Sequence, residues 1–268
     1  MLWILDMDGV LWLGQSPIAG SAEAIEILEA NGHEVIFTTN NSFMTRDGYL
    51  NKLHSFSIRA EPHQIYSSAM AAANLVRHES LVGVLGGPGV TEALDRLHVP
   101  WIRLSDSADQ DNLEKAMADS AIGALIVGYH VDFGYQNLSR AISVLNSGAR
   151  LVATNSDPTY PTPSGLVAGT GALVAAVAYG AQKVPCYAGK PDQPMVDLVS
   201  DLVARATGTI VVGDRPSTDG LFAKALGASF ALVYSGVTSK DSYPDNDFEI
   251  RIDHHAGDLL ELVRSFEF

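Results

Sequence analysis

The 268-residue chain has a single cysteine, Cys186. One thiol cannot form an internal disulfide or a cluster of thiolate zinc ligands, which fits a reducing compartment. No apolar run approaches the roughly 20 residues of a membrane-spanning helix. The first residues have no basic segment and reach a carboxylate at Asp6, unlike a secretory signal peptide. These absences predict a soluble, cytoplasmic protein in which Cys186 is a buried, inert strand residue.

Basic residues are also scarce. The 17 Lys and Arg residues stand against 31 Asp and Glu, for a formal net charge of −14. Such a balance disfavours nucleic acid and anionic membranes as partners, because both attract basic surfaces. The apolar content of 47% is typical of a globular protein that buries a sizeable core. We therefore expect neither a nucleic-acid nor a membrane partner.

Short apolar runs alternate with helical patterns along the chain. Between the runs, apolar side chains recur at helical spacing in residues 134–146 and 194–206. Continuous rather than alternating apolar runs are typical of parallel strands covered on both faces, and they occur at residues 3–5, 35–37, 210–212 and 230–233. The alternation predicts an α/β fold with a mainly parallel sheet.

Two carboxylates, Asp6 and Asp8, stand where the first predicted strand ends. In parallel α/β sheets, ligands bind beyond the carboxyl ends of the strands. Close like charges resist joint ionisation unless a cation or a proton joins them, so the pair indicates a site for one of these. The alternative is a turn with solvated acids. Trp12 and Leu13, just beyond, either flank the site entrance or form an apolar hairpin.

Polar residues Thr39, Asn40 and Asn41 follow the second apolar run. Their hydroxyl and amide groups can donate hydrogen bonds to phosphate oxygens without adding charge. Alternatively, this cluster caps the next helix, with Ser42 or Thr45 as the capping residue.

A lysine and two more acids follow later predicted strands. Lys190 comes after the strand predicted at residues 186–188, and it either reaches the sheet edge as a point charge or is an ordinary exposed lysine. Asp214 stands at a strand end and Asp219 in the first turn of the next helix. Carboxylates suit a hard divalent cation, although Asp219 alone could complement the helix dipole. Together, the four strand ends supply what one Mg²⁺ ion and one phosphoryl group would require.

These four motifs stand in the order found in the haloacid dehalogenase (HAD) superfamily. The chain resembles its NagD-like, 4-nitrophenylphosphatase-like branch, in which a large cap lies between the second and third motifs. The resemblance extends into the cap at residues 127–129, 153–157 and 169–172. It implies a Rossmann-like parallel-sheet core, residues 1–79 and 185–268, with a second, smaller α/β cap domain, residues 80–184.

The resemblance also implies a role for each motif residue. Asp6 would be the nucleophile that forms an aspartyl phosphate, and Asp8 the general acid and base. Asp6, the backbone carbonyl of Asp8, and Asp214 would bind Mg²⁺, with Asp219 supporting the metal shell from behind. The phosphate oxygens would be held by Thr39, the amide of Asn40, Asn41 and Lys190.

Substrate choice is expected from a segment of the cap. Residues 155–163 are predicted to form a loop stiffened by three prolines. The resemblance implies that this loop faces the catalytic groups, although a rigid surface turn is the alternative. His130 stands where relatives commonly carry an acid. The candidate specificity residues are Asn155, Asp157, Thr159 and Tyr160.

The reaction class follows from Asp8 and from motif spacing. Dehalogenase members of the superfamily lack this second acid, so its presence indicates phosphoryl transfer. Asp8 and Asn41 are 33 positions apart, too few for the cap that phosphomutases usually insert there. The prediction is a Mg²⁺-dependent phosphatase acting on a small phosphorylated metabolite, with a possible homodimer through the cap. A phosphotransferase or phosphomutase is one alternative, and a non-enzymatic phospho-acceptor or phosphate-binding domain is another.

Overall fold

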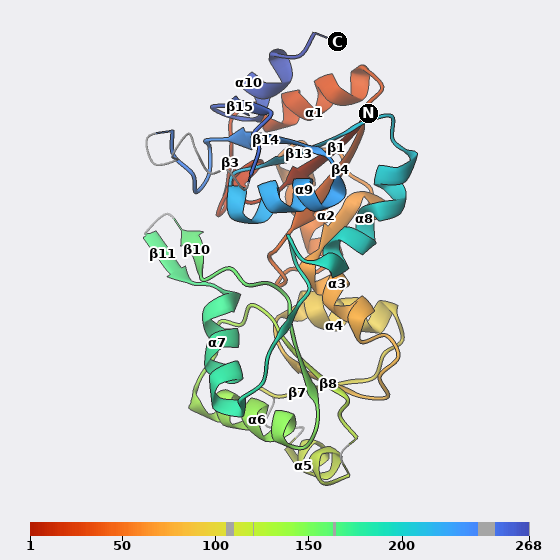
Figure 1. Cartoon of the computed structure of the whole chain (residues 1–268), viewed down its shortest axis with the longest axis vertical. Coiled ribbons are helices and arrows are strands. Elements are labelled where there is room, and N and C mark those ends of the chain that lie inside the picture. The colour runs from red at the N-terminus through yellow and green to blue at the C-terminus, as the bar shows by residue number, and fades with distance from the viewer. Residues whose placement is uncertain (106–109, 120, 163–164, 241–249, 268) are drawn as a thin grey trace.

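The computed structural model describes residues 1–105, 110–119, 121–162, 165–240 and 250–267. The chain forms two lobes that follow one another along the long axis of the molecule, and both termini lie in the same lobe (Figure 1). Each lobe is built around its own parallel sheet. The predicted α/β class with a parallel-sheet core is therefore confirmed.

The first lobe contains a six-stranded sheet in the order β15-β14-β13-β1-β4-β5, with every neighbouring pair parallel. Residues of β1 alternate between two cores, with Trp3 and Leu5 on one face and Leu2 and Ile4 on the other. The apolar runs at residues 3–5, 35–37, 210–212 and 230–233 are continuous because both faces are covered. The strands are β1 Leu2–Asp6, β4 Glu34–Thr39, β5 Ile65–Ser67, β13 Thr209–Gly213, β14 Ser229–Val233 and β15 His254–Ala256.

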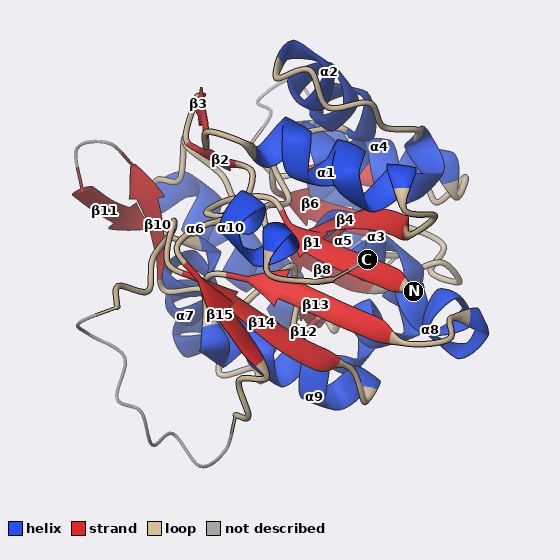
Figure 2. Ribbon diagram, turned by 90° about the horizontal axis from the view of Figure 1, so that it is seen from above, coloured by secondary structure: helices blue, strands red, loops and turns tan. Residues whose placement is uncertain are grey.

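Helices cover both faces of this sheet (Figure 2). One face is covered by α1 Ser21–Ala30, α2 Arg46–Ser55 and α10 Leu259–Arg264. The other is covered by α8 Gln193–Arg205 and α9 Leu221–Leu226. Helix α8 matches the helical spacing predicted at residues 194–206. A 3₁₀ turn at Pro62–Gln64 precedes β5, and a π-helical turn at Pro216–Gly220 leads into α9.

The second lobe contains a five-stranded parallel sheet in the order β12-β9-β8-β6-β7. Its strands are β6 Val82–Leu85, β7 Trp101–Arg103, β8 Ala124–Val127, β9 Arg150–Ala153 and β12 Cys186–Tyr187. One face carries α5 Gln110–Ala118, α6 Tyr135–Asn146 and α7 Thr170–Ala181, and the other carries α3 Ser68–Leu75 and α4 Pro88–Arg96. None of the described helices is long and apolar enough to cross a membrane.

Strand β12 lies at the edge of the second sheet, where Cys186 pairs with Val152. This sheet therefore extends to residue 187, beyond the cap limit of 184 expected from the sequence, while the division into domains stays a prediction. Cys186 is exposed. The expectation that it is buried was wrong, because β12 is a two-residue edge strand with a neighbour on one side only.

Two antiparallel hairpins complete the fold and lie on the same side of the molecule (Figure 2). One pairs β2 Trp12–Leu13 with β3 Ser16–Pro17, so of the two alternatives left open for this segment the hairpin is present. The other pairs β10 Thr159–Thr162 with β11 Gly165–Ala168. The segment predicted as a loop at residues 155–163 thus enters a strand at Thr159, because partner residues 165–168 supply its hydrogen bonds. Its last residue, Pro163, lies outside the described residues.

Candidate active site

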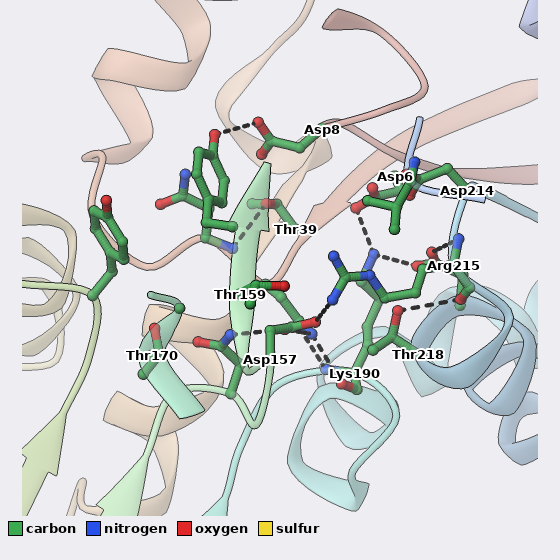
Figure 3. A pocket seen from close by; sticks show the side chains of 18 residues that line it. Asp6, Asp8, Thr39, Asp157, Thr159, Thr170, Lys190, Asp214, Arg215 and Thr218 are labelled. Carbon is green, nitrogen blue, oxygen red and sulfur yellow. Dashed lines mark hydrogen bonds and ion pairs between the residues drawn. The ribbon is translucent and has the colours of Figure 1, made fainter. Parts of the chain in front are cut away.

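Strand ends from both sheets meet at one pocket (Figure 3). The first sheet contributes residues at or just after the ends of β1, β4 and β13, and the second contributes residues that follow β8, β9 and β12. The pocket has an empty volume of about 590 Å³, part of which is open to solvent. Every site residue predicted from the sequence lines it: Asp6, Asp8, Thr39, Asn40, Asn41, Asn155, Asp157, Thr159, Tyr160, Lys190, Asp214 and Asp219.

Three buried carboxylates, those of Asp6, Asp214 and Asp219, form one group. Each can offer an oxygen within 4.8 Å of the others. The ammonium of Lys190 donates to Asp6 Oδ1 at 2.6 Å and to Asp219 Oδ1 at 2.7 Å. Lys190 is 2% exposed, so it is not an ordinary surface lysine. With all three acids ionised, the lysine leaves two negative charges uncompensated, which a divalent cation would balance.

The pKa values of these groups reflect the crowding of charge. Burial raises the pKa of Asp6 well above its usual value, Lys190 opposes this, and Asp219 and Asp214 add to it. Burial also raises the pKa of Asp214 to about 7, helped by the charge of Asp219. Burial alone would lower the pKa of Lys190, but Asp219 and Asp6 together raise it above its usual value. The lysine therefore stays charged, while the raised pKa values of Asp6 and Asp214 favour protonation of these two acids when no cation is bound.

The carboxylate group fits a divalent metal ion, because buried oxygens converge with excess negative charge. Asp219 was predicted to support the metal shell from behind, and its carboxylate lies in the same group as the two predicted ligands. The carboxylate of Asp8 accepts hydrogen bonds from Trp12 and Tyr160 and is not part of this group. Only the backbone carbonyl of Asp8 was predicted to bind the metal. These metal-binding roles stay predictions.

Gly9 brings the first and fourth motifs close together. Its φ of +91° is in the left-handed region, where side chains are strained. A Cβ at this position would also collide with the carboxylate of Asp214. Glycine is therefore required at the turn that follows the paired acids.

Lys190 reaches the site from the second sheet, because it follows β12. Its ammonium reaches the acids of the first sheet, as expected, although the strand that precedes it pairs within the second sheet. Asn40 fixes the backbone around the lysine: its Oδ1 accepts from Lys190 N at 2.7 Å, and its Nδ2 donates to Lys190 O at 3.0 Å. The Asn40 side chain thus binds the lysine loop, and the contact predicted between the amide of Asn40 and a phosphate stays a prediction.

Thr39 and Asn41 make local hydrogen bonds at the end of β4. Thr39 Oγ1 accepts from Asn41 N at 3.0 Å, and Asn41 Oδ1 accepts from Phe43 N at 3.0 Å. Thr45 caps α2 by accepting from Gly48 N, as one alternative expected. Thr39 and Asn41 therefore line the pocket without being the caps of the helix.

Asp8 lies apart from the carboxylate group (Figure 3). Its Oδ1 accepts from Trp12 Nε1 at 2.9 Å and from the Tyr160 hydroxyl at 2.8 Å. Burial raises the pKa of the Tyr160 phenol, and the charge of Asp8 and this hydrogen bond raise it further. The phenol is therefore held as a hydrogen-bond donor.

Asp157 links residues of both lobes. Its Oδ1 accepts from Arg215 Nη1 at 2.8 Å, and its Oδ2 accepts from Asn40 at 2.9 Å and Asn155 at 2.7 Å. The Asp157 and Arg215 side chains are 14% and 18% exposed, so the ion pair is largely shielded from water. The segment around Asp157 is thus held against the catalytic groups.

The sequence reasoning gave no role to several residues that line the pocket. Arg215 had a detectable signal, as a charged residue directly after Asp214 at a strand end. Val237 had none, since only the fold brings it to the site. His130 is not among the described residues that line the pocket. The others without an assigned role are Tyr129, Gly169, Thr170 and Thr218.

Comparisons with known proteins agree with this arrangement. A model of haloacid dehalogenase-like hydrolases matches residues 3–100, and a HAD-hydrolase-like model matches residues 187–262. The 4-nitrophenylphosphatase of Schizosaccharomyces pombe is 30% identical over 98% of this chain and 93% of its own. The glycerol-3-phosphate phosphatase of Gallus gallus is 34% identical over 98% of this chain and 91% of its own.

A solved structure is similar across the whole fold. The glycerol phosphate phosphatase of Mycobacterium tuberculosis, in complex with magnesium, has a TM-score of 0.82 at 25% identity and covers 98% of this chain and 77% of its own. Both lobes, not just the first, are therefore shared with a phosphatase. The chain belongs to the phosphatase branch of the haloacid dehalogenase-like hydrolases.

Proposed function

We propose that the protein is a Mg²⁺-dependent phosphatase that hydrolyses small phosphate monoesters through an aspartyl-phosphate intermediate on Asp6. The observation that carries this proposal is the contrast between two nearby acids. Asp6 is buried among charges and paired with Lys190, whereas Asp8 is bound by two neutral donors on the other side of the pocket. This contrast supports attack on phosphorus by one carboxylate and proton transfer by the other.

In the first half of the reaction, a carboxylate oxygen of Asp6 forms a bond to phosphorus as the ester P–O bond breaks. The electron pair of the broken bond goes to the leaving oxygen, which takes a proton from Asp8. Lys190 offsets the negative charge that accumulates between Asp6 and the phosphoryl oxygens. Thr39, the amide of Asn40 and Asn41 orient those oxygens by hydrogen bonds.

In the second half, water attacks the aspartyl phosphate. Asp8, now a carboxylate, takes a proton from this water as its oxygen bonds to phosphorus. The bond between phosphorus and Asp6 breaks, and its electron pair returns to the Asp6 carboxylate. The second half restores both acids and releases inorganic phosphate.

Asp6, Asp214 and the carbonyl of Asp8 would hold the Mg²⁺ ion, with Asp219 beside them. When bound, a divalent ion supplies positive charge that stabilises the negative phosphoryl oxygens in the transition state. The raised pKa values of Asp6 and Asp214 agree with this assignment, because burial and the charge of neighbouring acids disfavour ionisation in the absence of a cation. The magnesium in the similar mycobacterial phosphatase supports it as well.

The substrate is proposed to be a small phosphorylated metabolite. The leaving group would lie between Asp8 and the segment from the second lobe, where Thr159 and Tyr160 line the pocket. Asn155 and Asp157 would act on selectivity by holding this segment in place. The named relatives include a 4-nitrophenylphosphatase and a glycerol-3-phosphate phosphatase. Family membership by itself therefore does not identify the leaving group.

Hydrolysis of 4-nitrophenyl phosphate tests the proposal. Wild-type protein is assayed with Mg²⁺ and with EDTA, and the Asp6→Asn variant is assayed with Mg²⁺. We expect release of free phosphate that requires the metal and falls by roughly 10⁴-fold or more in the variant. Transfer of the phosphoryl group to an added alcohol without free phosphate would instead indicate a phosphotransferase.

The variant also tests the intermediate. Rapid acid quenching with radiolabelled ester should trap the phosphoryl group on wild-type protein but not on Asp6→Asn. Undiminished turnover by a folded Asp6→Asn protein would overturn the proposed nucleophile.

A further inference from the structure

We propose that Tyr160 is a positioning residue for Asp8, so that docking of the second-lobe hairpin completes the acid/base group. The inference rests on the proposed function and adds a role for the Tyr160 hydroxyl beyond contact with substrate. The juxtaposition that carries it is a single carboxylate oxygen, Asp8 Oδ1, which accepts from Tyr160 at 2.8 Å and from Trp12 at 2.9 Å.

Two donors on one oxygen determine where Asp8 can carry a proton. An oxygen that already accepts from an O–H and an N–H group has no room for a proton of its own. A protonated Asp8 therefore carries its proton on Oδ2, which is left free of these donors. The two hydrogen bonds prevent rotation of the carboxyl group. They therefore orient the Oδ2 proton toward the leaving group of a substrate that lies beside this oxygen.

Among the residues that the structure describes, side chains of the first lobe hold the Trp12 ring. The indole is fully buried, and the ammonium of Lys52 lies 4.1 Å from the ring centroid. Lys52 also donates to Gly14 O at 2.7 Å, within the turn of the same hairpin, and Phe56 packs on the indole at 5.9 Å between ring centroids. The Trp12 donor therefore stays in place however the second lobe is positioned.

Tyr160 comes from the second lobe. It lies on β10, 152 positions from Asp8, and is paired with Val167 of β11. Its ring lies 5.9 Å from that of Tyr129, which in turn packs edge-on against Phe43 of the first lobe at 5.9 Å. The second donor to Asp8 is thus present only when hairpin β10–β11 lies against the first lobe, as it does here.

The test compares two esters of nearly equal shape, 4-nitrophenyl phosphate and phenyl phosphate. The 4-nitrophenolate ion leaves readily without a proton, whereas phenolate, with a conjugate-acid pKa near 10 as in tyrosine, gains from protonation. We expect Tyr160→Phe to lower kcat/KM for phenyl phosphate about tenfold more than for 4-nitrophenyl phosphate, a part of the 10²–10⁴-fold that general acids typically contribute. The ratio kcat/KM reports the step in which the leaving group departs.

Two further variants serve as controls. Tyr129→Phe removes a neighbouring hydroxyl that is not among the described donors to Asp8, so it should change kcat/KM of both esters by the same factor. Trp12→Phe removes the other donor and should reproduce the selective loss on phenyl phosphate. Because both donors act through one carboxylate, the double variant should lose less than the product of the two single losses.

The outcomes separate this inference from the proposed function. Equal loss on both esters in a folded Tyr160→Phe protein would overturn the positioning role and leave the phosphatase assignment intact. Absence of Mg²⁺-dependent hydrolysis of 4-nitrophenyl phosphate by the wild-type protein would overturn both. A selective loss on phenyl phosphate supports the inference, with melting temperature measured to confirm that each variant is folded.

Discussion

The two sheets share their architecture but contribute different chemistry. Both are parallel, both have apolar strands covered on two faces, and both end at the same pocket. The first sheet places all four acids of the catalytic motifs there, at or after the ends of β1 and β13, together with polar residues at the end of β4. The second lobe places Lys190 there, together with further polar side chains and Asp157, whose charge is neutralised by Arg215 of the first lobe.

This difference shows why the site requires both lobes. The acids of the first sheet repel one another, and Lys190 from the loop after β12 is the side chain that pairs with two of them. Asp8 similarly takes one donor from each lobe. We infer that the first lobe supplies the reactive groups, while the second compensates their charge and sets their orientation.

Among the changes that break this division between the lobes, replacement of Lys190 should lower activity the most, because it removes the charge with which the second lobe compensates the acids of the first. Lys190→Met removes the positive charge that the second sheet adds to the acids, and we expect kcat for 4-nitrophenyl phosphate to fall roughly 10²–10³-fold. Thermal unfolding should also change, because breaking a buried ion pair typically costs about 3–5 kcal/mol unless the acids take up protons. Steady-state kinetics and calorimetry would measure both.

Lys183→Met is the matched control, since Lys183 is exposed in the same connecting segment. It should leave activity and melting temperature unchanged. If Lys190→Met retained wild-type kcat, the second sheet would not be needed to compensate the charge of the acids.

Breaking the ion pair between Asp157 and Arg215 should have a smaller effect. Asp157→Asn weakens a contact that holds the second-lobe segment against the first sheet, and we expect KM to rise about tenfold, equivalent to about 1.4 kcal/mol. Arg215→Gln should act similarly, and the double variant should be little worse than either single change.

The control for Asp157→Asn is Asp119→Asn, which makes the same charge change at an exposed position of the second lobe. Fully additive losses in the Asp157 and Arg215 double variant would show that the two side chains act separately. The ion pair between Asp157 and Arg215 would then not be what holds the second-lobe segment against the first sheet.

The smallest expected effect is a pH-dependent rise in melting temperature when Mg²⁺ binds. Because the pKa of Asp214 is raised to about 7, from a usual value of 3.8, the folded metal-free protein binds more protons than the unfolded chain between these values. Its stability therefore falls as pH rises through that window, and the penalty persists at higher pH. Mg²⁺ should relieve this penalty, so it should raise the melting temperature more near pH 8 than near pH 5.5, where protons compete with it.

The expected difference is a few degrees, about 2–4 °C per kcal/mol for a chain of this size. Differential scanning fluorimetry with and without Mg²⁺ at both pH values measures it. The Asp214→Asn variant should show a smaller dependence on pH. An equal rise in the wild-type protein at both pH values would contradict the role assigned to the carboxylate group.

Much of the fold could be read from local patterns. Continuous apolar runs at residues 3–5 and 210–212 predicted the central strands, and helical spacing at residues 134–146 and 194–206 predicted α6 and α8. The motif residues were found for the same reason, because polar groups directly after an apolar run mark the carboxyl end of a strand. Such features depend on neighbours within a few positions.

Short segments were predicted less well. Hairpin β10–β11 was read as a loop, since prolines at 158 and 161 gave no sign of strand pairing. Cys186 was expected to be buried because its apolar neighbours resemble a strand interior, yet an edge strand has only one neighbour. Two- to four-residue strands depend on distant partners that a local pattern does not contain.

The sequence by itself determined which polar residues stand at the ends of apolar strands, because residue types and short spacings are local properties. Only the tertiary structure decided how they pair. Lys190 contacts Asp6 across 184 positions, Tyr160 contacts Asp8 across 152, and Arg215 contacts Asp157 across 58. Such pairs form where two separately built sheets bring their strand ends together, and that meeting is set by the packing of the lobes, not by any spacing along the chain.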